Sequence, residues 1–97
     1  MEAQILERLP GAEIVLPGIA DLKAGRSSTN ALAVESAASR LRALGLDAPG
    51  ARGEEPATHR LYRQLQGELG DSAHSRYNAI LSRVVSFARA AERASVR

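Results

Sequence analysis

The sequence predicts an all-α fold: a small domain of four to five helices that ends in a long amphipathic helix. Apolar residues make up 44% of the chain, and most of them are Ala and Leu, which favour helix. Only three residues are aromatic, and the β-branched residues that favour strands are few. A chain of 97 residues suits one domain. We therefore expect residues 1–97 to form a single helical domain.

The N-terminal region begins with a helical segment and then contains the one strand-like run of the chain. Residues 1–9 favour a short helix that the following Pro-Gly pair stops. The run AEIVL at 12–16 comes next and is closed by a second Pro-Gly pair. A lone strand finds no partner within the chain. This run is therefore an extended linker, a helical turn or a strand that pairs across a dimer.

The middle of the chain predicts two helices separated by a cluster of capping residues. Residues 19–25 form a short helix that ends at Gly25, because Gly accepts the left-handed conformation that follows a helix. Residues 27–30 are all of the types that cap a helix N-terminus. A longer helix then runs to about Leu44, with apolar residues at helical spacing.

The last third of the chain predicts a polar loop and two helices. The loop covers residues 47–56 and is rich in Gly and Pro, and Pro56 suits the first position of a helix that reaches about Leu69. Asp71 caps the longest helix, which runs to about Ala94. Its apolar residues form one continuous stripe at 100° per residue: Ala73, Tyr77, Ile80, Leu81, Val84, Phe87, Ala88 and Ala91.

Composition excludes several classes of protein. The chain has no Cys, which excludes a disulfide framework and a thiolate zinc site and fits a reducing compartment. Residues 1–9 lack the basic start and apolar run of a signal peptide. No run of about 18 apolar residues is present, so we expect no membrane association. We expect a cytoplasmic protein without a cofactor.

Charge is modest in total but uneven along the chain. The net charge is +2, and the basic residues are twelve Arg and one Lys. Residues 1–50 carry a net charge of −1, and residues 51–97 a net charge of +3. The planar guanidinium of Arg holds two phosphate oxygens at once, so this preference for Arg over Lys is compatible with an anionic partner.

The stretch ADLKAGRSS at 20–28 resembles a phosphate-binding loop only in part. Gly25 and Ser27 fit the pattern if Arg26 replaces its Lys, but the chain lacks the parallel strands that such a loop requires. The stretch is better interpreted as the end of one helix and the start of the next. Unpaired backbone N–H groups at a helix start still attract anions, so Arg26, Ser27, Ser28 and Thr29 are candidate anion contacts.

The same stretch has the ingredients of a helix-turn-helix: a short helix, a Gly turn and a longer helix. A recognition helix places polar residues in its first turn, and residues 27–30 with Arg26 before them meet that requirement. The run ALAVE that follows is apolar and acidic where groove contacts should lie. A structural helical hairpin is the favoured interpretation, and DNA binding is the alternative.

The last helix carries a row of arginines that forms the other candidate site. The helix dipole favours cations near a helix C-terminus, which accounts for those that lie closest to the end. Contact with an acidic partner or a nucleic acid is the functional alternative. The row consists of Arg76, Arg83, Arg89, Arg93 and Arg97.

Catalytic groups are sparse. His59 and His74 lie in different predicted helices, and neither has a metal-ligating residue at the spacing that one helix face requires. His74 can reach Asn78 one turn later. We therefore expect no enzyme activity, and we predict a small interaction module that presents a helical face to a protein partner, with homodimerisation as one form. The alternative is a nucleic-acid binder that uses Arg26, the cap cluster 27–30 and the C-terminal arginines.

Overall fold

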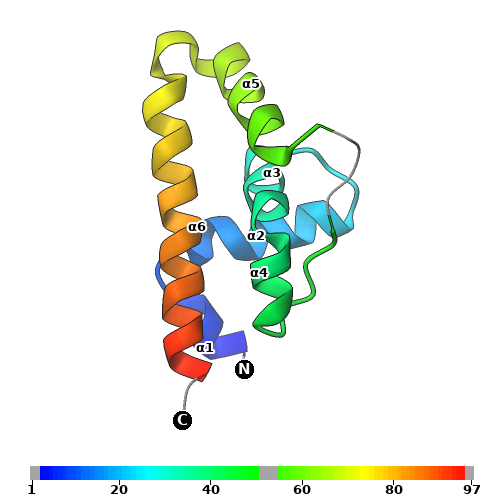
Figure 1. Ribbon diagram of the computed structural model, residues 1–97, viewed down its shortest axis with the longest axis vertical. Coiled ribbons are helices and arrows are strands. Elements are labelled where there is room, and N and C mark those ends of the chain that lie inside the picture. Colours follow the sequence, from blue (N-terminus) through cyan, green and yellow to red (C-terminus); the bar gives the residue numbers. More distant parts are fainter. Residues whose placement is uncertain (1–2, 51–54, 96–97) are drawn as a thin grey trace.

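The structure, a computed structural model, describes residues 3–50 and 55–95 (Figure 1). These residues form six α-helices and one 3-10 turn, and they contain no strand. The predicted all-α fold with a long C-terminal helix is therefore confirmed. The elements in chain order are α1 (Ala3–Arg8), α2 (Ala12–Lys23), α3 (Thr29–Ser36), α4 (Ala38–Ala43), α5 (Ala57–Leu69), η1 (Gly70–Ser72) and α6 (Ala73–Ser95).

Helix α2 corrects the prediction for residues 12–25. The strand-like run forms its first turns, and the helix continues through Pro17 and Gly18 to Lys23, so the second Pro-Gly pair does not close it. Pro17 lies on the exposed side of α2, whereas Gly18 is buried. A Cβ atom on Gly18 would lie 2.5 Å from the carbonyl oxygen of Asn30. Close packing of α2 on α3 therefore outweighs the poor helix propensity of this pair.

The start of α2 lies directly against α6. Gly11 caps α2 with a φ of 84°, in the left-handed region that favours glycine. A Cβ atom at this position would lie 2.1 Å from the carbonyl oxygen of Arg83. Glycine therefore lets the chain turn out of α1 and lets the backbones of α2 and α6 approach.

Helix α3 packs between α2 and α5 and also contacts α6. The predicted helix over 30–44 is interrupted after Ser36, where Ala37 leaves helical geometry and α4 begins at the next residue. The Ser36 hydroxyl donates to the carbonyl oxygen of Ala33 at 2.6 Å. Such a bond competes with the helical backbone pattern, and it accompanies the break.

The core is built on the predicted apolar stripe of α6. Phe87 is fully buried, and Ile80 and Val84 are almost so, which confirms the stripe; Tyr77 and Leu81 lie at its half-buried edge. Helix α6 packs mainly on α5 and α2 and also touches α3 (Figure 1). Its predicted contact with the helix at 30–44 is therefore present but is not the main one.

The predicted polar loop is described only at its two ends. Ala48 is buried, and Arg42 of α4 donates to its carbonyl oxygen at 3.2 Å. Lys23 of α2 pairs with the neighbouring Asp47 at 2.8 Å. Residues 51–54 lie outside the described part of the chain. Within the described residues, the helices are too short or too polar to cross a membrane.

Candidate functional site

The predicted anion contacts at the start of α3 converge on a carboxylate of the chain itself. Ser28 is the N-cap, and its Oγ accepts the N–H of Ala31 at 3.1 Å. The same hydroxyl donates to Oδ2 of Asp21 at 2.7 Å, and Arg26 Nη1 contacts Oδ1 at 2.8 Å. These bonds, first that from Ser28 and then that from Arg26, lower the pKa of Asp21 below its ordinary value. Sequence reasoning did not identify Asp21 as their partner.

The other two predicted contacts, Ser27 and Thr29, bond Gln64 of helix α5, although Ser27 stays exposed. The Gln64 amide reaches the start of α3, and the orientation that best satisfies it donates to the carbonyl oxygen of Ser27 at 3.0 Å. In that orientation its oxygen accepts the backbone N–H and the hydroxyl of Thr29, both at 3.3 Å. Side chains of α2 and α5 therefore supply the groups that an external anion would bring to this helix end.

The predicted recognition helix lies inside the domain. Residues 31–35 of α3 are all buried, and Thr29 and Asn30 are half-buried. A recognition helix must expose its first turns to base edges. The packing of α3 between α2 and α5 leaves these turns covered.

The arginines of α6 do not gather on one side of the helix. Arg83 bonds Glu13 of α2 through Nε at 2.9 Å and through Nη2 at 2.6 Å, and this contact lowers the pKa of Glu13 below its ordinary value. Arg76, Arg89 and Arg93 are exposed and make no ion pair with a described residue. Positions 76 and 89 lie about 140° apart around the helix axis. Arg97 lies outside the described residues.

A shallow groove lies between α5 and α6. It has a volume of about 470 Å³ and is lined mainly by aromatic, imidazole and other uncharged groups. Arg63 supplies its one charged side chain, and no carboxylate lines it. The lining includes Thr58, His59, Tyr62 and Arg63 of α5, with His74 and Tyr77 of α6.

The two tyrosines that line this groove contact each other. The rings of Tyr62 and Tyr77 pack edge to face, with centroids 5.1 Å apart and planes at 77°. His74 meets Tyr62 in the same manner at 6.4 Å. It also contacts Asn78 at 3.2 Å, as its spacing predicts. Sequence reasoning placed Tyr77 on the apolar stripe of the last helix, and no spacing signal pairs it with Tyr62 on a separate helix.

The groove continues into an exposed surface along α6, which we call the outer strip. Val85 is 37% exposed and Leu81 is half-buried, so apolar surface extends past the groove toward the C-terminus. Positions on the strip lie within about 60° of one direction around the helix axis. The strip consists of His74, Tyr77, Leu81, Val85, Arg89 and Glu92.

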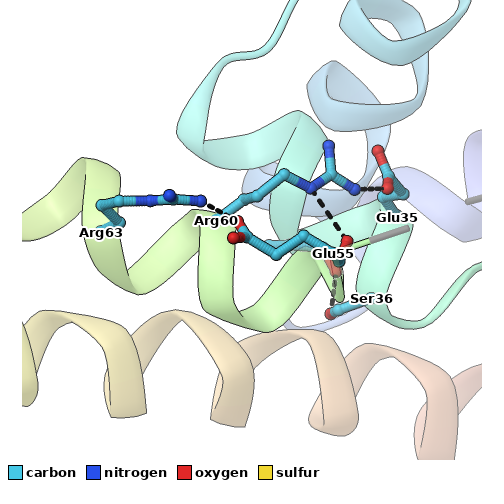
Figure 2. Close-up of polar contacts among 6 residues, drawn as sticks. Glu35, Ser36, Glu55, Arg60 and Arg63 are labelled. Carbon is cyan, nitrogen blue, oxygen red and sulfur yellow. Dashed lines mark hydrogen bonds and ion pairs between the residues drawn. The ribbon is translucent and has the colours of Figure 1, made fainter. Parts of the chain in front are cut away.

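A buried ion pair holds α5 in the position that forms the groove (Figure 2). The carboxylate of Glu35 on α3 is only 2% exposed and pairs with Arg60 of α5. Arg60 Nε also donates to the backbone carbonyl of Glu55 at 3.3 Å, and the Glu55 side chain pairs with Arg63 (Figure 2). These contacts tie the first turns of α5 to α3, so they have a structural role.

The described residues contain no cluster of three or more His, Asp or Glu side chains that could hold a metal ion. Comparisons of the chain with protein families, with curated proteins and with solved structures find no match. The surface is therefore interpreted from its own geometry.

Proposed function

We propose that the protein is a small, non-catalytic helical interaction module that binds an α-helix of a protein partner along the α5–α6 groove and the outer strip. The observation that carries this proposal is the half-exposed pair Tyr62 and Tyr77 in a groove without carboxylates, continuous with the exposed Val85.

Composition of the surface supports a protein partner. Tyrosine and arginine are enriched among the residues that contribute most to protein–protein binding. A tyrosine ring buries a large area at a low cost in side-chain entropy. The edge-to-face contact already restricts Tyr62 and Tyr77, so little further ordering accompanies binding.

The spacing of the outer strip supports a helical partner. Tyr77, Leu81 and Val85 follow one another at intervals of four residues along α6. Anchors at such intervals form a straight row, which is the surface that a second helix packs against.

The nucleic-acid alternative has less support. The first turns of α3 are covered, and Arg76 and Arg89 lie on different sides of α6. A nucleic-acid groove usually aligns its cations along the backbone path and interleaves them with aromatic rings.

A photo-crosslinking residue at position 85 tests the proposed function in the source cell. We expect a discrete protein adduct at Val85 that Tyr77→Ser abolishes, and none at Ala79, which is exposed about 120° away on the same helix. Equal labelling at both positions, or none at Val85, would contradict the proposal.

Titration with duplex and single-stranded nucleic acid between about 50 and 200 mM salt tests the alternative, since phosphate contacts make such binding salt-dependent. We expect no binding above that of an unrelated protein. Salt-dependent binding that is lost in the Arg89→Ser, Arg93→Ser variant would favour the nucleic-acid function instead.

A further inference from the structure

We propose that the helix bound by the outer strip is α6 of a second copy of the chain, so that two α6 helices pair antiparallel about a two-fold axis. This inference rests on the proposed function and names the partner of the same surface. It follows from the sequence order of the groups along the strip.

The strip is complementary to itself when it is reversed. A two-fold axis that passes beside position 83 brings together residues whose numbers add to 166, because an antiparallel pairing inverts the order of positions. Leu81 then faces Val85 of the second copy, and Val85 faces Leu81. The centre of the interface is therefore apolar, and both of its residue types already reach the surface.

The same register pairs two polar groups of the strip. His74 faces Glu92 of the second copy, because both lie at the centre of the strip, and this places an imidazole beside a carboxylate. The contact occurs twice, as a two-fold interface requires.

The positions around the axis agree with this register. On a helical wheel, Leu81 and Val85 lie about 20° on either side of the centre of the strip, and Tyr77 and Arg89 about 60° on either side. His74 and Glu92 both lie at the centre. Leu81 and Val85, with His74 and Glu92, therefore lie near enough to the centre of the strip to meet across the axis, whereas Tyr77 and Arg89 lie on opposite flanks of the interface.

Contacts within one chain leave these groups accessible. Arg40 bonds Oε1 of Glu92 through Nε and Nη2, both at 2.6 Å, so the second carboxylate oxygen remains available to the imidazole. Arg89 is exposed and has no ion pair with a described residue.

The size of the interface sets its strength. The strip from His74 to Glu92 is about 27 Å long, since each residue advances a helix by about 1.5 Å. A single pair of helices of this length buries less than the roughly 1,200–2,000 Å² of a stable interface. The dimer is therefore weak, and the dimeric fraction rises with protein concentration.

Cysteine cross-linking tests the register directly, because the chain contains no Cys of its own. We would mix Leu81→Cys and Val85→Cys, one of them with a mass tag, under mild oxidation. Antiparallel pairing predicts that the mixed disulfide exceeds either symmetric one several-fold. Predominance of the symmetric products, or a yield no higher than that of Ala79→Cys, would overturn the proposal.

Sedimentation provides a second measurement. The mass should rise from 10.3 kDa toward twice that value with concentration, Val85→Arg should remove the rise, and Ala79→Arg should keep it. A monomer up to about 1 mM would overturn the dimer. If a photo-adduct at position 85 then contains a different protein, the proposed function survives while this inference fails; if no adduct forms, both fail.

Discussion

Asp21 acts as a tethered anion at the start of α3. It accepts the hydroxyl of Ser28 at 2.7 Å and the guanidinium of Arg26 at 2.8 Å. A carboxylate held within the same chain has an effective concentration far above that of most free ions. An external phosphate at this position must therefore displace Asp21, which explains why a pattern that attracts anions can have a purely structural use.

Titration of the Asp21 carboxyl tests this role. We expect its pKa in the folded protein to lie below the ordinary value of 3.8, and Ser28→Ala to move it upward. A depressed pKa means that the ionised form stabilises the fold above that pH and that this contribution is lost as the pH falls. The measurement is the carbon chemical shift of the carboxyl group against pH. An unchanged pKa in Ser28→Ala would contradict this account.

Gly11 is a second residue whose identity the packing fixes. Gly11→Ala introduces a Cβ atom 2.1 Å from the Arg83 carbonyl oxygen at a φ of 84°, so we expect a loss of more than about 2 kcal/mol in the free energy of unfolding. Gly67→Ala is the matched control. Position 67 lies within α5 with no atom near an added Cβ, and we expect a gain of about 0.5–1 kcal/mol there. Urea unfolding measures both, and equal effects would contradict the close approach of α2 to α6.

At the scale of elements, α6 shows what periodicity can predict. The expected helix from Asp71 to about Ala94 is found as α6 over 73–95, because its apolar residues repeat over about five turns and leave one arrangement for the core. Helix α2 shows the limit. Pro17 and Gly18 are residues that usually end a helix. The contact of Gly18 with α3 is a tertiary interaction, which the local sequence does not reveal.

The α5–α6 groove was beyond prediction for the same reason. Tyr62 and Tyr77 lie on separate helices, and their contact depends on the position of α5 along the axis of α6. That position is fixed in part by the pairing of Arg60 with Glu35, which are 25 residues apart. The contact of His74 with Asn78 was predictable because it lies within one turn of one helix.

Replacement of a large side chain by Ala tests which face of α6 belongs to the core. Phe87→Ala should lower the free energy of unfolding by about 3–5 kcal/mol, because this fully buried ring leaves a cavity. Val85→Ala, on the exposed side two residues earlier, should change it by no more than about 0.5 kcal/mol at a concentration where the chain is monomeric. Thermal or urea unfolding compares the two. A loss below about 1 kcal/mol for Phe87→Ala would contradict the core assignment.

At the scale of the whole molecule, ion pairs connect helices that are distant in the sequence. Glu13 and Arg83 join α2 to α6, and Arg40 and Glu92 join α4 to α6. The hydrogen bond from Arg83 lowers the pKa of Glu13, and that from Arg40 lowers the pKa of Glu92. These carboxylates are exposed, so their contribution depends on salt.

Acid should therefore lower the stability of the folded chain. Both carboxyls titrate below their ordinary value of 4.5, so the stability they provide is present above that pH and is lost as the pH falls further. We expect the urea midpoint to fall between about pH 7 and about pH 3. The fall should be smaller in the Glu13→Gln, Glu92→Gln variant. An equal fall in that variant would show that these two pairs do not contribute.

The burial of α3 has a consequence for how the molecule opens. We expect α1, which packs chiefly on α2, to separate more readily than α3, which touches α2, α5 and α6. Amide hydrogens in the buried segment 31–35 can meet solvent only when several helices part together. Their exchange rates therefore report the opening of the whole domain, and those of α1 report local fraying.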